Sequence, residues 1–224
     1  MDQDIKWYDY QVAMSRKSMF NYYITTDFAT SEKTASDFSV ISVWGYNAKG
    51  DWYWVDGICK RQLMDANIDD LFRLAQKWMP QQVGIEVSGQ QGGFIPWIEK
   101  EMLNRNIFFT LASENNSGKA GVRPSTNKME RFNVVVPWFK TGRMWFPENM
   151  KHTMIMREAI DELSLAAPNG FRSKHDDFID TISMLAVLHT WKPSAGAVVT
   201  SDEYDPFEDV GDEEDESAYE SYLP

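Results

Sequence analysis

Acidic residues interrupt apolar segments at three places in this chain. Asp27 and Glu86 each end a short apolar segment, and Asp177 and Asp180 lie at the start of an apolar helical pattern. A carboxylate beside Ile, Val and Phe is costly to bury unless its charge is compensated. Mg²⁺ or Mn²⁺ would compensate all four, because these ions prefer oxygen ligands. Two such ions about 3.5–4 Å apart can hold both oxygens of a phosphodiester displacement, so the pattern predicts a metal-dependent nuclease.

Cysteine and histidine are too few for other kinds of metal site. The chain has one cysteine, Cys59, which excludes an internal disulfide framework, and its three histidines argue against structural zinc. No apolar run approaches the roughly 18 residues that a membrane span needs, and no signal-peptide pattern is present. We therefore expect no membrane contact and a reducing, cytosolic setting.

The net charge of −12 argues against nucleic acid as a ligand until its distribution is considered. Residues 201–224 contain eleven acidic residues and no Lys or Arg, so the remaining residues carry a net charge of only −1. An acidic metal site would account for part of what is left. The acidic residues of the tail are Asp202, Glu203, Asp205, Glu208, Asp209, Asp212, Glu213, Glu214, Asp215, Glu216 and Glu220.

The length suits one domain with appendages. We expect residues 1–20 to be a lead-in or linker segment, residues 21–192 to form the domain, and residues 193–224 to be an acidic, disordered tail because they are poor in apolar side chains. The region from 113 to 127 is rich in Gly, Ser and Asn and is expected to be an exposed loop or hairpin.

The order of predicted elements indicates an α/β fold with a mixed central β-sheet flanked by helices. Strands at 22–28, 37–46 and 51–57 would form an antiparallel meander. Helices are then predicted at 68–78, 94–103, 128–140, 152–163 and 176–189, and strands at 83–87, 107–111 and 144–146. Pro137 is expected to disturb the helix that contains it. This order is the one seen in ribonuclease H-like domains.

Each strand-end carboxylate also has a purely structural interpretation. Asp27 could form an Asx turn with the residues that follow it. Glu86 could belong to a buried ion pair, because a lone Glu in an apolar strand needs a partner. Asp37, which begins the next predicted strand, could reach back toward Asp27 across the hairpin. A glycine-rich segment after Glu86 resembles a phosphate loop, but it lacks the Gly-Lys-Ser/Thr ending.

The last predicted helix begins with three aspartates. Asp176, Asp177 and Asp180 are spaced so that they share a face, where like charges repel. The helix dipole softens this repulsion, and Asp176 is expected to cap the helix. Capping does not need three aspartates, so we expect Asp177 first and Asp180 second to bind metal. His175 is either a polar flank or a proton carrier beside the metals.

Basic residues gather in the middle of the chain. Lys119 and Arg123 lie in the predicted loop, and Lys128 and Arg131 are three apart on one predicted helical face. Such residues are usually solvated surface. Here they could form a local basic patch that contacts the phosphates of a nucleic acid without reading its sequence.

Taken in order, these motifs resemble one family. The chain resembles the nuclease domain of the large terminase subunit, the DNA-packaging motor of tailed bacteriophages, over roughly residues 20–190. The resemblance rests on Thr26-Asp27-Phe28-Ala29-Thr30-Ser31, Asp37-Phe38-Ser39-Val40-Ile41, Gly84-Ile85-Glu86, Lys128-Met129-Glu130-Arg131-Phe132 and His175-Asp176-Asp177-Phe178-Ile179-Asp180.

The resemblance implies a ribonuclease H-like fold and an Mg²⁺- or Mn²⁺-dependent endonuclease that cuts concatemeric double-stranded viral DNA in the cytoplasm of an infected bacterium. Asp27, Glu86 and Asp177 match the family's metal-binding carboxylates, with Asp176 and Asp180 beside them. Lys128 and Arg131 match a basic pair that faces DNA or the active site. The implied partners are a terminase ATPase domain or chain, since this sequence has no P-loop, together with the small terminase subunit and the portal.

Two other functions fit the same residues. Another ribonuclease H-like enzyme, such as a Holliday-junction resolvase, would use the same carboxylates for a different DNA substrate. A catalytically silent binding or regulatory domain would keep the acidic cluster for structural reasons and would contact a partner through the region from 113 to 131.

Overall fold

The structure, a computed structural model, describes residues 4–29, 38–87, 93–167, 170–171, 173 and 175–194. Asp37, the glycine-rich segment after Val87 and the predicted acidic tail beyond Ser194 lie outside the described residues.

A six-stranded mixed sheet forms the centre of the fold. Its strands lie in the order β1-β6-β4-β3-β2-β5. The pairs β2–β3 and β3–β4 are antiparallel, and β1–β6, β6–β4 and β2–β5 are parallel. The strands are β1 (Lys6–Tyr8), β2 (Phe20–Asp27), β3 (Ser39–Asn47), β4 (Trp52–Lys60), β5 (Gln82–Ile85) and β6 (Met144–Pro147).

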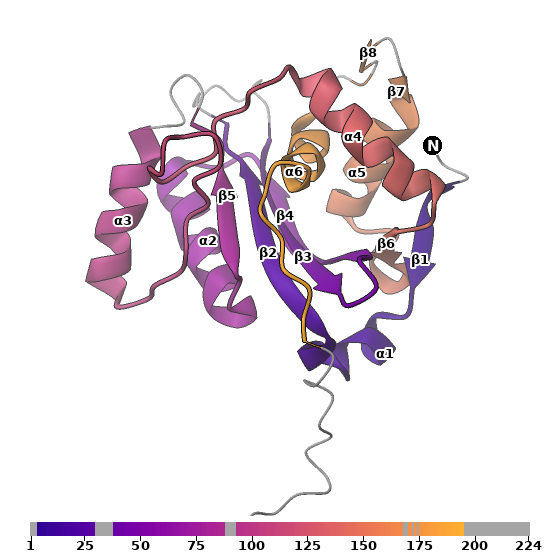
Figure 1. Ribbon diagram of the computed structural model, residues 1–224, viewed down its shortest axis with the longest axis horizontal. Helices are drawn as coiled ribbons and strands as arrows, with labels where there is room; N and C mark the ends of the chain where they lie inside the picture. Colours follow the sequence, from indigo (N-terminus) through magenta and orange to yellow (C-terminus); the bar gives the residue numbers. More distant parts are fainter. Residues whose placement is uncertain are drawn as a thin grey trace, which may run out of the picture.

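Helices cover both faces of the sheet (Figure 1). They are α1 (Tyr10–Met14), α2 (Met64–Trp78), α3 (Phe94–Arg105), α4 (Lys128–Lys140), α5 (Met154–Leu165) and α6 (Asp177–Leu185). Two short 3-10 helices, η2 (Lys17–Met19) and η4 (Glu148–Met150), and a small hairpin of β7 (Ala166–Ala167) and β8 (Gly170–Phe171) complete the described elements.

Two apolar cores lie on opposite faces of the sheet. The core under α2 and α3 contains Ile24, Ile41 and Leu71, and the core under α4, α5 and α6 contains Trp44 and Phe178. Since the central strands are buried on both faces, apolar residues stand at consecutive positions in them, such as Val40 and Ile41 in β3, instead of strictly alternating. The α/β fold with a mixed sheet between helices confirms the fold class predicted from the sequence.

Several polar side chains inside the sheet have hydrogen-bond partners. The Trp44 indole Nε1 donates to Thr25 Oγ1 at 2.9 Å, and Ser42 Oγ lies 3.0 Å from Thr181 Oγ1 of α6. Buried polar groups are costly unless they are bonded in this way. The second of these bonds also fixes α6 over β3, close to the centre of the sheet.

Parallel pairing of β2 and β5 brings two of the predicted carboxylates to one end of the sheet. The register pairs Thr26 with Ile85. Asp27, the last residue of β2, and Glu86, the residue after β5, therefore emerge side by side. The first turn of α6 lies at the same end, because α6 packs over β2 and β3. Strand direction thus assembles the candidate site from three distant segments.

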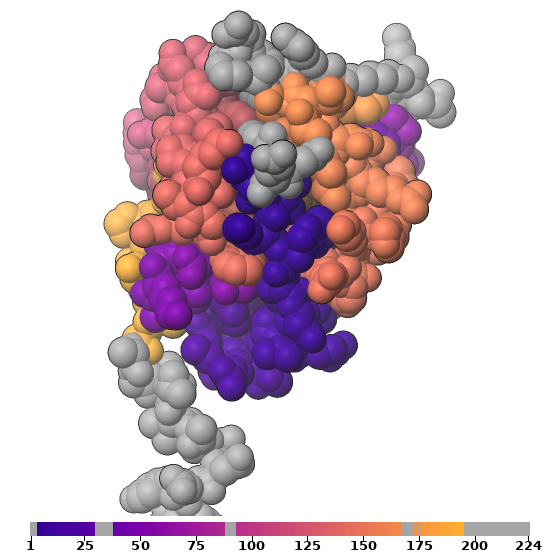
Figure 2. Space-filling model, turned by 90° about the vertical axis from the view of Figure 1, so that its right-hand side faces the viewer, coloured from indigo at the N-terminus to yellow at the C-terminus, as the bar shows by residue number. Residues whose placement is uncertain are grey.

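Several details differ from the sequence-based expectations. The predicted lead-in contains β1, which pairs with β6, so the sheet begins before residue 21. Figure 2 shows this N-terminal segment between later parts of the chain. The strand predicted at 107–111 is reduced to a single bridge from Leu111 to Val83. Helix α4 continues through Pro137, which is exposed, and α6 ends at Leu185 instead of residue 189.

Among the described residues, no helix is both long and apolar enough to cross a membrane.

Gly121 supplies a test of how the segment directly after β5, which carries Glu86, is packed. Its φ is +97°, and a Cβ there would lie 2.0 Å from Val87 Cγ1. Gly118 also has a positive φ, +76°, but nothing lies within 4 Å of its Cβ position. Both alanine variants bear the backbone strain, and only Gly121→Ala adds a clash. We expect Gly121→Ala to lower the free energy of unfolding by about 1–3 kcal/mol more than Gly118→Ala, as measured by urea denaturation. Equal losses would contradict the packing described here.

Candidate active site

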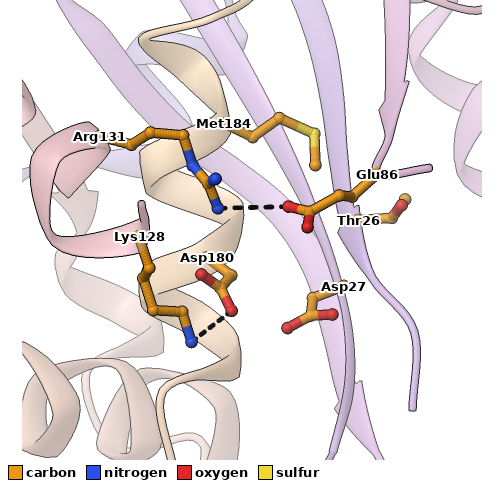
Figure 3. A pocket seen from close by; sticks show the side chains of 7 residues that line it. All are labelled: Thr26, Asp27, Glu86, Lys128, Arg131, Asp180 and Met184. Carbon is orange, nitrogen blue, oxygen red and sulfur yellow. Dashed lines mark hydrogen bonds and ion pairs between the residues drawn. The ribbon is translucent and has the colours of Figure 1, made fainter. Parts of the chain in front are cut away.

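A pocket of about 260 Å³ opens at the end of the sheet where β2 and β5 finish. Its walls come from β2, the residue after β5, α4 and α6 (Figure 3). The lining residues are Thr26, Asp27, Glu86, Lys128, Arg131, Asp180 and Met184. Three of the predicted metal ligands and two of the predicted basic residues therefore meet in one pocket.

Glu86 is held in place by its neighbours along the chain. The Val87 N–H donates to the Val122 carbonyl at 2.9 Å, and the Val122 N–H donates to the Ile85 carbonyl at 2.8 Å. Thr26 Oγ1 donates to the Gly84 carbonyl at 3.1 Å, which ties β2 to β5 beside the pocket. These bonds fix the backbone on both sides of the Glu86 side chain.

Helix α6 approaches β5 closely because Gly84 has no side chain. A Cβ at position 84 would lie 2.5 Å from the Met184 sulfur. Met184 is one helical turn after Asp180, so the packing of Met184 against Gly84 of β5 sets the rotation of α6 about its axis. That rotation places Asp180 in the pocket, where its carboxylate meets Lys128 (Figure 3).

Lys128 neutralises two carboxylates at the start of α6. Its Nζ lies 2.6 Å from Asp180 Oδ2 and 2.7 Å from Asp176 Oδ2. Burial of the ammonium group would lower the pKa of Lys128, but the two carboxylates outweigh burial and raise it. Lys128 therefore stays charged inside the pocket. Lys128 is the first residue of α4. Helix α4 begins at this residue because the Asn127 side chain caps it by accepting from the Glu130 N–H at 2.9 Å.

Arg131 pairs with the other wall of the pocket. Its Nη2 lies 3.3 Å from Glu86 Oε2, and its Nη1 donates to the Thr126 carbonyl at 3.1 Å. The residue is only 9% exposed. Lys128 and Arg131 thus point inward from one turn of α4, and both contact the acidic residues of the pocket (Figure 3).

The Asp180 carboxylate is only partly compensated. Burial raises its pKa above the ordinary value, Lys128 offsets part of this effect, and Asp176 and Glu86 add to it. Among the described residues, Asp180 Oδ1 is buried and has no hydrogen-bond partner. A buried carboxylate oxygen without a donor is suited to a cation.

The donor set fits a hard divalent cation in kind, although it is not closed around one position. Asp27, Glu86 and Asp180 offer carboxylate oxygens to a single pocket. No three Asp, Glu, His or Cys side chains of the described residues come close enough to hold one ion as they lie. In this arrangement, Lys128 and Arg131 supply the positive charge that a metal ion would bring.

Comparison with solved structures finds terminase nuclease domains. The human cytomegalovirus terminase nuclease domain soaked with Mn matches with a TM-score of 0.58 and 10% identity, over 82% of this chain and 92% of that chain. The same domain with Mn and an inhibitor has a TM-score of 0.55 and 11% identity over the same shares. The large terminase nuclease of the thermophilic phage G20c with bound magnesium has a TM-score of 0.48 and 17% identity, over 75% of this chain and 80% of that chain.

The chain has a ribonuclease H-like fold. Identities this low show the fold and nothing finer. No protein-family model matches the chain, and no curated protein matches it significantly.

Within this ribonuclease H-like fold, Asp177, another predicted ligand, is the first residue of the helix that carries Asp180. It is not among the residues that line the pocket. Its Oδ2 accepts from the Phe38 N–H at 3.0 Å and lies 3.9 Å from His175 Nδ1. The His175 ring, in turn, meets the Phe38 ring edge-on at 5.1 Å. Asp177 and His175 therefore lie beside each other at the start of β3, one helical turn before Asp180.

Asp176 occupies the N-cap position of α6, but its side chain makes no capping hydrogen bond, contrary to the sequence-based expectation. Its carboxylate is drawn to Lys128 instead. Glu162 of α5 takes over the capping role, because its Oε2 accepts from the Ile179 N–H at 2.9 Å. Sequence reasoning missed this residue, although Glu162 falls three positions after the buried Ala159 on the apolar face of its helix.

The other predicted basic residues are not in the pocket. Lys119 and Arg123 are exposed on the segment between Ser113 and Asn127, which is irregular, as the sequence predicted. Thr26 and Met184 also line the pocket and were not anticipated. Thr26 could have been found from the sequence, because it directly precedes the candidate ligand Asp27. Met184 could not, because its place in an apolar helical pattern is that of an ordinary core residue.

Glu162 provides a test of how α6 is held. Burial raises its pKa to about 8, which outweighs the hydrogen bonds from the start of α6. An unfolded Glu titrates near pH 4.3, so between about pH 5 and pH 8 the native chain holds the extra proton and its stability falls as pH rises. In Glu162→Gln, which stays neutral and can still accept from Ile179, this part of the pH dependence should disappear.

The measurement is the free energy of unfolding across that pH window. Asp161→Asn is the matched control, because Asp161 is the exposed neighbour on the same helix. It should keep the wild-type pH dependence. If Glu162→Gln and the wild type lose stability in parallel as the pH rises, the buried cap is not the titrating group.

Proposed function

We propose that this chain is a metal-dependent endonuclease that cuts concatemeric double-stranded viral DNA during genome packaging. The observation that carries the proposal is the convergence of Asp27, Glu86 and Asp180 on one pocket at the end of the sheet. Three carboxylates from separate segments, one with a buried oxygen that has no hydrogen-bond partner among the described residues, suit a hard divalent cation.

The fold supports this proposal. The structures that share it include a viral terminase nuclease domain soaked with Mn. We infer Mg²⁺ or Mn²⁺ as the cofactor here, with two ions as the family resemblance suggests. A divalent ion bound at such a site supplies positive charge that activates water and stabilises the leaving oxygen of a phosphodiester.

The residues of the chain divide into three roles. Asp27, Glu86 and Asp180 would hold metal. Asp177 stays a predicted ligand, since it is one turn from Asp180 on the same helix. In the described structure, its contact with the Phe38 N–H ties the start of β3 to the start of α6. Three further residues are proposed to hold these ligands in position without binding metal themselves: Asp37, Asp176 and His175.

Lys128 and Arg131 are proposed to exchange partners when metal and DNA bind. In the described structure, they neutralise Asp180 and Glu86. If these carboxylates held metal, Lys128 and Arg131 would be available for the phosphates of the DNA strand. Lys119 and Arg123, exposed on the neighbouring segment, would contact the duplex farther from the pocket. The proposed protein partners are a terminase ATPase domain or chain, the small terminase subunit and the portal.

A second candidate is a catalytically silent domain of the packaging machine. It is favoured by the absence of a closed metal cluster among the described residues and by the ion pairs that already neutralise the pocket. A nuclease and a silent domain differ in their response to Mn²⁺: a silent domain would show no thermal stabilisation by this ion.

A junction resolvase, the other alternative, would cut four-way junctions in preference to linear duplexes offered beside them.

Removing pocket carboxylates tests the nuclease proposal. Asp27→Asn, Glu86→Gln and Asp180→Asn should each lower the rate of plasmid cleavage in Mn²⁺ by about 100-fold or more, because each removes a charged ligand. Each should also shrink the rise in Tm that Mn²⁺ causes, a readout that does not need activity. Asp161→Asn is the control and should behave as the wild type.

Asp177→Asn in the same titration tests the fourth predicted ligand. Asn can still accept from the Phe38 N–H, so a lost Mn²⁺ shift would report ligation and not misfolding. The nuclease proposal would be refuted by wild-type cleavage in the pocket variants or by undiminished cleavage in EDTA.

Lys128 supplies a sharper prediction about competition. Since its ammonium group occupies the carboxylates that metal would use, Lys128→Gln should bind Mn²⁺ about five- to tenfold more tightly, equivalent to roughly 1 kcal/mol. Cleavage should nevertheless fall, because a phosphate contact is lost. Lys140→Gln is the matched control: Lys140 ends the same helix and pairs with Asp4, away from the pocket. Unchanged or weaker Mn²⁺ binding, measured by calorimetry, would show that Lys128 does not compete with the ion.

A further inference from the structure

Positive side chains gather at the end of the sheet opposite the pocket. They come from the segment before β2, the turn after β3, the residue before β6 and the segment after α6. We call them the cationic pole: Arg16, Lys17, Lys49, Arg143 and Lys192, all of which are exposed.

Backbone and side-chain contacts bring these segments together. Phe20, at the start of β2, pairs with Asn47 at the end of β3. Asn21 Nδ2 donates to the Trp191 carbonyl at 2.8 Å, which holds the segment after α6 against β2. The side chain of Lys192 packs over Gly50, with Nζ 3.7 Å from the Cβ position of that glycine. Figure 2 shows these parts of the chain side by side at one end of the molecule.

The pole carries little negative charge of its own. Among the described residues, none of its five side chains forms an ion pair with a carboxylate. Asp51 lies in this region, next to Trp52, whose N–H donates to the Arg143 carbonyl. Asp51 is hydrogen-bonded to the Asn47 side chain, with Nδ2 3.2 Å from Oδ2. Uncompensated charge of one sign raises the local concentration of polyanions.

The most acidic segment of the chain follows Lys192 of the pole closely in the sequence. Ser194, the last described residue, is two positions after Lys192, and Asp202 follows eight positions later. Eight residues can span at most about 28 Å, so the acidic segment starts within reach of the pole. A segment tethered this closely has an effective concentration on the order of millimolar.

We propose that the acidic segment, residues 201–224, docks on the cationic pole of its own chain. Eleven negative charges within 24 residues meet five exposed cations with no paired carboxylate in the described structure. The docked segment excludes other polyanions from this surface, and nucleic acid competes with it for the same cations.

This regulation acts away from the chemistry of the pocket. Phe20 and Asp27 are the two ends of β2, so the pole lies about 23 Å from Asp27 at ~3.3 Å per residue. The acidic segment therefore controls how firmly the protein holds DNA and leaves the pocket open. The inference does not depend on the nuclease function, because it concerns binding alone.

A double-mutant cycle tests the docking. Binding to a nonspecific duplex is measured in EDTA, so that cleavage cannot interfere. Deleting residues 201–224 should tighten binding about tenfold at low salt, and the gain should shrink as salt is added. In a Lys49→Glu/Lys192→Glu background the same deletion should change the affinity less than about twofold, because the deleted segment no longer masks those cations.

A matched background separates docking from bulk charge. Lys100 and Arg157 are exposed cations of α3 and α5, and in Lys100→Glu/Arg157→Glu the deletion should keep its full effect. An equal gain in all backgrounds would show that the tail acts only through net charge and would overturn the proposal. No gain in the wild type would overturn it as well.

Zero-length carbodiimide crosslinking locates the contact directly. Mass spectrometry should find tail carboxylates joined to Lys17, Lys49 or Lys192, in a yield independent of protein concentration. Mixing isotope-labelled and unlabelled chains distinguishes the occupants: crosslinks between the two would place the tail on a second copy and contradict docking in cis. Crosslinks confined to Lys119 or Lys128 would place it at the other end of the molecule.

Discussion

The ion pairs between α4 and the acidic end of the sheet are the interaction on which the site depends. Asp27, Glu86 and Asp180 are brought together by strand direction and helix packing, and their mutual repulsion must be offset. Lys128 and Arg131, one helical turn apart, provide that offset and fasten α4 to α6 and β5 in doing so. Losing one partner of such a partly buried pair leaves a charge uncompensated inside the pocket.

The same ion pairs connect structure to the proposed function. A pocket whose carboxylates are neutralised by Lys and Arg side chains could exchange those side chains for metal without leaving the carboxylates uncompensated. Asp180 is the proposed point of exchange, because one of its oxygens contacts Lys128 and the other is buried without a hydrogen-bond donor among the described residues. Cations released from the carboxylates remain in the pocket, where a phosphate would lie.

Local patterns predicted the fold and the two strand-end acids because both depend on neighbours in the sequence. Asp27 and Glu86 end apolar strands, and parallel strands finish at the same edge. The choice between Asp177 and Asp180 depends on the rotation of α6, which Met184 sets by packing on Gly84 of another element. Glu162 caps α6 from a different helix, so the spacing around α6 alone could not reveal it. Pro137 is tolerated because it lies on the exposed face of α4.

The central claim is that the pocket between β2, β5, α4 and α6 holds divalent metal on three carboxylates. A crystal soaked in Mn²⁺ and measured at the manganese absorption edge tests it most directly. We predict an anomalous peak among Asp27, Glu86 and Asp180, with the Lys128 ammonium displaced from Asp180. A pocket without a peak, with the Lys128 and Arg131 ion pairs intact at saturating Mn²⁺, would contradict the account.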